Sequence, residues 1–91
     1  HMAAIEIEVE TLEDMEEALE HGARIILLDN MSLDDLRLAV TLNKGRAVLE
    51  ASGGVTLDSV KAIAATGVDV ISSGAITHSA PCLDLGLDFL D

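Results

Sequence analysis

The sequence predicts an α/β fold in which strand–helix units repeat around a parallel sheet. One observation is a pattern that occurs three times: an apolar strand ends in an acid, a Ser or Thr followed by Leu and an acid comes next, and Gly closes the helix. The second is composition, because 49% of residues are apolar but only 1% aromatic, so the core must be aliphatic, as in parallel sheets covered by helices. We expect half of a (β/α) barrel or, alternatively, an open flavodoxin-like three-layer sheet, since both use this unit.

Each unit has local signals that start and stop its elements. In the first unit we expect a strand over 5–9, a helix cap at Thr11 and a closing Gly22. In the second, the strand is 25–29, the cap Ser32 and the glycine Gly45. In the third, they are 47–50, Thr56 and Gly67. Ser and Thr accept hydrogen bonds from the first N–H groups of a helix, and the acids behind them interact favourably with its dipole. Glycine adopts the left-handed conformation that ends a helix. Apolar residues at helical spacing support the helices: Leu12, Met15, Leu19; Leu33, Leu36, Val40; Val60, Ile63, Ala64.

The second strand, over 25–29, shows no alternation of apolar and polar residues, which is typical of a strand covered on both faces. A fourth strand is expected at 68–72. Connections of this length give parallel neighbours with right-handed crossovers.

The last part of the chain departs from the repeat. The segment 74–79 is expected to leave the fourth strand as a turn of small residues, and Pro81 suits the start of a helical turn. Beyond it, apolar residues alternate with acids and glycine, which favours a terminal strand over 83–89.

Composition excludes several classes of function. The net charge is −12 with five Lys and Arg, so a nucleic-acid-binding surface is not expected. No apolar run approaches the roughly 20 residues that cross a bilayer, and there is no signal-peptide pattern. The single cysteine, Cys82, allows no internal disulfide and fits a cytoplasmic protein. We expect one domain over 3–91, with His1-Met2 as a cloning remnant.

Three acids and one glycine turn are the candidate functional features. Glu8, Asp29 and Glu50 recur at an equal sequence spacing, each at a strand end, so we expect them at the same carboxyl edge of the sheet. Ser52-Gly53-Gly54 follows the third strand and precedes a helix start, where backbone N–H groups suit a phosphate. An ordinary strand-to-helix turn explains the local sequence equally well. Asn30, which precedes the cap Ser32, is expected to have only a structural role in the turn.

Four segments carry a resemblance to quinolinate phosphoribosyltransferase: Glu6-Ile7-Glu8-Val9, Ile26-Leu27-Leu28-Asp29-Asn30-Met31, Leu49-Glu50-Ala51-Ser52-Gly53-Gly54 and Gly74-Ala75-Ile76-Thr77-His78-Ser79. The resemblance covers residues 5–89 and corresponds to the C-terminal half of that family's barrel domain. It implies transfer of phosphoribosyl from phosphoribosyl pyrophosphate to quinolinate with Mg²⁺, releasing carbon dioxide and giving nicotinate mononucleotide.

The resemblance also implies roles for individual residues. Glu8 and Asp29 would meet the ribose hydroxyls and the Mg²⁺–pyrophosphate region. Ser52, Gly53 and Gly54 would cradle the ribose 5′-phosphate. Gly74 and His78 would form a second part of the phosphate site, with Glu50 at its floor. Hard carboxylates are suitable Mg²⁺ ligands together with substrate phosphates.

The cations that such anionic substrates require are absent from the expected site. Arg24, Lys44 and Arg46 precede strands, at the opposite edge from the acids, and Arg37 and Lys61 lie on helices. We therefore expect an excised, reconstructed or designed barrel fragment without catalytic residues of its own. The alternatives are an enzyme part that retains phosphoribosyl binding, or a stand-alone phosphate-binding module. Open strand edges favour a homodimer.

Overall fold

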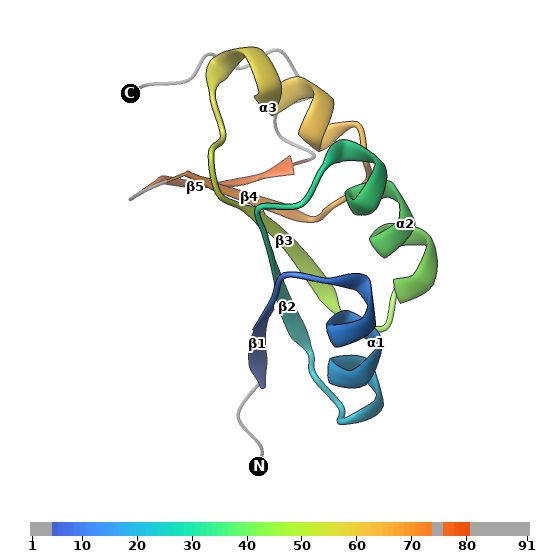
Figure 1. Ribbon diagram of the computed structural model, residues 1–91. Helices are drawn as coiled ribbons and strands as arrows, with labels where there is room; N and C mark the ends of the chain where they lie inside the picture. Colours follow the sequence, from blue (N-terminus) through green and yellow to red (C-terminus); the bar gives the residue numbers. More distant parts are fainter. Residues whose placement is uncertain (1–4, 74–75, 81–91) are drawn as a thin grey trace.

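The computed structural model describes residues 5–73 and 76–80 (Figure 1). Its elements follow in the order β1 (Glu6–Val9), α1 (Leu12–Glu20), β2 (Ile25–Asp29), α2 (Leu33–Asn43), β3 (Val48–Ser52), α3 (Leu57–Ala64), β4 (Val70–Ser73) and β5 (Ile76–Ser79). The predicted helix caps are confirmed: the side chains of Thr11, Ser32 and Thr56 accept hydrogen bonds from the main chain three residues later.

One five-stranded sheet carries the fold, with strand order β1-β2-β3-β4-β5. The first four strands are parallel and neighbours in sequence order, so every crossover steps in the same direction. Right-handed crossovers that all step one way place their helices on one face, and the three helices lie along the outer side of the curved sheet (Figure 1). In a flavodoxin-like sheet the strand order reverses direction at one point, so helices cover both faces. The βα-repeat prediction is confirmed, with the strand order of a (β/α) barrel.

The core lies between the sheet and the helices. Met15, Ile26, Leu28, Leu49 and Ile71 are its largest fully buried side chains. The helices expected from the apolar spacing are confirmed, and Leu33, at the first position of α2, is 36% exposed. The buried residues of α2 include Ala39 and the polar Asn43.

The face of the sheet opposite the helices is open in this part of the chain. Ile25 and Leu27 are only half-buried, and Val48 is 43% exposed. The expectation that β2 is covered on both faces is therefore wrong for this chain alone: its residues alternate between the buried helix side and this open face.

The structure also corrects the expectation for 74–79. Ile76–Ser79 forms β5, which pairs antiparallel with β4 through Val70↔Ser79 and Ser73↔Ile76. A parallel neighbour needs a crossover of a dozen or more residues, whereas two intervening residues allow a hairpin. Gly74 and the predicted strand over 83–89 lie outside the described residues. No helix in the described ranges is long and apolar enough to cross a membrane.

Candidate functional site

The three predicted acids lie on the open face of the sheet but at different positions along the strand direction. Glu8 pairs with Leu27 of the neighbouring strand, and Leu27 in turn pairs with Glu50. Glu8 and Glu50 are thus level, two strands apart, or roughly 10 Å between main chains at the usual strand spacing. Asp29 lies two residues nearer the carboxyl edge than this row and pairs with Ser52. The expectation of three acids at one edge position is therefore corrected for Glu8 and Glu50.

The physical cause is the unequal length of the two crossovers, to which both the helices and the loops contribute. α1 has 9 residues and α2 has 11, so the two crossovers use different amounts of chain between paired positions. Equal spacing of the acids in sequence does not then give equal height in the sheet. Asp29 remains the acid at the carboxyl edge, where the loops begin.

Asp29 and Ser52 are joined directly at that edge. The Ser52 hydroxyl donates a hydrogen bond of 3.1 Å to Asp29 Oδ1, and both side chains are half-buried. This bond holds the end of β3 against the end of β2. The structure thus brings together two of the predicted site residues, and the loop that contains Gly53 and Gly54 leaves from this point.

The two glycines of the loop have different surroundings. Gly53 has φ +119°, and a Cβ built on it would lie 2.7 Å from Asn30 Oδ1 and 3.2 Å from the Asn30 nitrogen. Gly54 is exposed, and a Cβ there would meet nothing within 4 Å. The Val55 N–H donates to the Gly53 carbonyl at 2.8 Å, which closes a tight turn. Gly53 is therefore packed from one side, while Gly54 is open to approach.

Helix α3 begins directly after this turn. Its first turn is fixed by a capping box, in which Thr56 Oγ1 accepts from the Ser59 N–H and Ser59 Oγ accepts from the Thr56 N–H at 2.9 Å. A hollow of about 370 Å³ lies beside this loop, between the ends of β2 and β3 and residues of α2 and α3. Its polar lining comes from Asn30, Ser32, Ser52 and Gly54, and the rest of its lining is apolar. An anion would be favoured at the start of α3, which follows the loop directly.

The structure describes only part of the segment that contains Gly74 and His78. His78 is in β5 and pairs with Ile71, so its main chain belongs to the sheet and not to a turn at the carboxyl edge. Gly74 lies outside the described residues. The register places the main chain of His78 level with Ala51, two strands away, so the role of Gly74 and His78 in a phosphate site stays a prediction.

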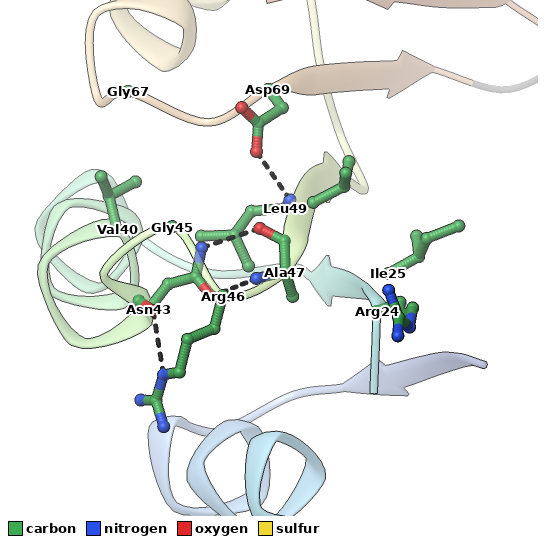
Figure 2. A pocket seen from close by; sticks show the side chains of 11 residues that line it. Arg24, Ile25, Val40, Asn43, Gly45, Arg46, Ala47, Leu49, Gly67 and Asp69 are labelled. Atoms are coloured by element: carbon green, nitrogen blue, oxygen red, sulfur yellow. Dashed lines mark hydrogen bonds between the residues drawn. The ribbon is translucent and has the colours of Figure 1, made fainter. Parts of the chain in front are cut away.

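The cations lie at the other end of the sheet, as the sequence predicted. Arg24, Asn43, Arg46 and Asp69 line a groove of about 570 Å³ at the amino-terminal edge (Figure 2). The Arg46 guanidinium donates to the Leu42 and Asn43 carbonyls at the end of α2, so its charge neutralises a helix terminus.

On the helices, Arg37 forms an ion pair of 2.8 Å with Asp34, the one ion pair among the residues described. Because the cations are held at the amino-terminal edge and on a helix surface, the carboxyl edge is negative.

A metal at the carboxyl edge would need help from a ligand. No group of three or more His, Cys, Asp or Glu side chains in the described ranges is arranged to hold a metal ion. Glu8 and Asp29, on adjacent strands and two residues apart in height, have main chains roughly 8 Å apart by strand geometry. Mg²⁺ commonly binds through one or two carboxylates with substrate oxygens and water, and these residues fit that mode.

Sequence reasoning missed the part that Asn30 plays in the loop. Asn30 has φ +56° and donates its N–H to the Ser52 carbonyl at 3.0 Å. The available signal was an Asn directly after a strand-end acid, because Asn tolerates the left-handed conformation. The contact with Gly53 depends on the pairing of β2 with β3, two segments far apart in the chain, which local sequence does not specify.

Comparison with known proteins identifies the relatives of this chain. The family model "Quinolinate phosphoribosyl transferase, C-terminal domain" matches residues 1–88. A probable nicotinate-nucleotide pyrophosphorylase [carboxylating] of Bacillus subtilis is 44% identical over 88 residues, which are 97% of this chain and 30% of the relative. The chain thus spans about a third or less of the relatives it matches.

Solved structures give the same result for the fold. The nicotinate-nucleotide pyrophosphorylase from Francisella tularensis superposes with a TM-score of 0.76 at 44% identity, covering 84% of this chain and 28% of that chain. The enzyme of that name from Ehrlichia chaffeensis gives a TM-score of 0.75 at 46% identity, covering 77% and 26%. The described units therefore have the arrangement found within these larger proteins.

Proposed function

The chain belongs to the quinolinate phosphoribosyltransferase family, and from this premise we propose that its carboxyl edge binds the phosphoribosyl group without transferring it. The observation that carries the proposal is the open main chain at Gly54, beside the start of α3 and next to the paired Asp29 and Ser52 side chains. In this proposal the 5′-phosphate lies over Ser52–Gly54. The ribose hydroxyls face Asp29 and Glu8.

The chemistry of the edge supports this orientation of the ligand. A phosphate is favoured at a helix start, where N–H groups and the dipole present partial positive charge. Hydroxyl groups are good donors to carboxylates, so the sugar suits the acidic open face. Mg²⁺, bound to pyrophosphate oxygens and to Glu8 or Asp29, would offset the repulsion between these acids and the pyrophosphate.

The distribution of charge is the reason to propose binding without transfer. Quinolinate is a dicarboxylate, and the reaction places it beside a pyrophosphate. Arg24 and Arg46 lie at the opposite edge, and Arg37 is paired with Asp34. These guanidinium groups are therefore not placed to offset the repulsion between the acids and a second anion. Steady formation of nicotinate mononucleotide by the purified chain would contradict this part of the proposal.

Calorimetry with phosphoribosyl pyrophosphate and Mg²⁺ tests the binding part. We expect millimolar or tighter binding that is lost in Gly54→Val, because the new Cβ enters open space and the valine methyl groups would fill the approach to the main chain. Thr41→Val, on the exposed side of α2, is the matched control. Absence of binding by the wild-type chain, or undiminished binding by Gly54→Val with an unchanged circular dichroism spectrum, would refute the proposal.

We also propose that two copies of the chain associate. The β1 edge has a described partner on one side only, and the open face carries half-buried Ile25 and Leu27 with exposed Val48. A second copy would bury this aliphatic surface, and salt would strengthen the contact by screening Glu6, Glu8 and Glu50. A monomer mass by light scattering at high protein and salt concentration would refute association.

A further inference from the structure

Asn30 lies where the turn after β2 meets the loop after β3. We propose that Asn30 is a positioning residue for the Ser52–Gly54 loop, and that its uncharged carboxamide is required at the mouth of the hollow for a phosphate to enter. The inference rests on the proposed function, since it assigns a residue that shapes the same phosphate site.

The main chain of Asn30 fixes the point where the loop starts. Its left-handed conformation, with φ +56°, turns its N–H toward the Ser52 carbonyl at a distance of 3.0 Å. This bond continues the β2–β3 pairing one residue past Asp29↔Ser52. Ser52 is therefore held twice, through its carbonyl by Asn30 and through its hydroxyl by Asp29. Gly53 leaves the sheet from a fixed position.

The side chain of Asn30 then determines the path of Gly53. Its Oδ1 atom occupies the space that a Gly53 Cβ would need, at 2.7 Å from that position. The other end of the loop is held by the capping box of Thr56 and Ser59. With both ends fixed, the main chain of Gly54 faces open space, where no atom lies within 4 Å of a Cβ built on it.

Charge gives Asn30 a second effect. Asn30 lines the hollow together with Ser52 and Gly54, and the Asp29 carboxylate accepts a hydrogen bond from Ser52 beside it. Asn, Asp and Gly all tolerate the left-handed conformation, so Asn30→Asp and Asn30→Gly should fold alike. Asp adds a negative charge at the mouth with almost no change of shape. Gly removes the side chain and adds no charge, so the pair separates electrostatic repulsion from loss of packing.

The experiment compares the wild type, Asn30→Asp and Asn30→Gly by NMR. Order parameters of the Gly53 and Gly54 amides are measured without ligand, and their chemical shifts are followed during titration with ribose 5-phosphate, with ribose as control. In Asn30→Gly we expect the two order parameters to fall from about 0.85 to below about 0.6, while those of β2 and β3 stay unchanged. In Asn30→Asp we expect ordered loop amides but about tenfold weaker binding at low salt, with most of the loss recovered at about 1 M salt.

The outcomes separate this inference from the proposed function. If the wild type does not bind ribose 5-phosphate, the proposed function fails, and the order parameters alone decide whether Asn30 positions the loop. Unchanged order parameters in Asn30→Gly would overturn the positioning role. Wild-type affinity of Asn30→Asp at low salt would overturn the requirement for an uncharged group. A residue with a merely structural role would show neither the confined loss of order nor the salt dependence.

Discussion

Replacing Gly53 by Ala tests the packing of the loop directly. An alanine at φ +119° costs about 1–3 kcal/mol, because this conformation is closed to residues with a Cβ. Its Cβ would also lie 2.7 Å from Asn30 Oδ1 and 3.2 Å from the Asn30 nitrogen. The oxygen can rotate away, but the nitrogen is held by its bond to Ser52. Alanine also lowers the entropy of the unfolded chain, which stabilises the fold by about 0.4–1 kcal/mol and offsets part of this cost. We expect a net loss of about 2 kcal/mol.

The assay is urea unfolding followed by circular dichroism, with thermal unfolding as a second readout. A loss of about 2 kcal/mol corresponds to a decrease in Tm of roughly 8–16 °C for a domain of this size. Gly54→Ala is the matched control, since its Cβ enters open space, and we expect it to change the free energy of unfolding by less than about 1 kcal/mol. A loss below about 0.5 kcal/mol for Gly53→Ala, or equal losses for the two variants, would refute the reasoning.

Two further substitutions test hydrogen bonds that hold the strands. Asn43 is 4% exposed; its side chain donates to the Ala47 carbonyl at 2.8 Å and accepts from the Ala47 N–H at 3.0 Å. Asn43→Ala leaves both main-chain groups unpaired, so we expect a loss of about 2–3 kcal/mol by urea unfolding, against less than about 0.5 kcal/mol for the exposed Thr41→Ala. Asp69 Oδ2 accepts from the Leu49 N–H at 2.9 Å. Asp69→Ala should lower stability by about 1 kcal/mol and speed hydrogen exchange at the Leu49 amide, whereas Asp69→Asn keeps an acceptor; equal exchange in all three proteins would contradict this.

The repeating units were predictable because their signals are local. Thr11, Ser32 and Thr56 cap helices through bonds that span three residues, so the sequence near each residue is sufficient. Gly22, Gly45 and Gly67 have the positive φ expected after a helix. The one-sided placement of the helices follows from repeated right-handed crossovers once the strand order is sequential.

Features set by pairing between units were predicted less well. The position of Asp29 along the sheet relative to Glu8 depends on the number of residues in each crossover. The equal spacing of the acids in sequence does not reveal this offset of two residues. The segment that forms β5 was expected to be a turn because it follows Gly74 and contains small residues. Its β-branched Ile76 and Thr77 favour a strand. Asn30 matters through contact with Gly53, which only the sheet register brings near. These properties belong to pairs of distant segments and not to either segment alone.

The one-directional order of the units has a consequence for how the chain holds together. Strands contact the next strand along the sheet, and among the stronger helix contacts α1 packs on α2 and α2 on α3. Stability then resembles that of a linear array, in which each unit is supported by its two neighbours. The middle pair β2–β3 is supported from both sides, while β1 depends on one interface. A cut or a join between two units therefore disturbs one interface at a time.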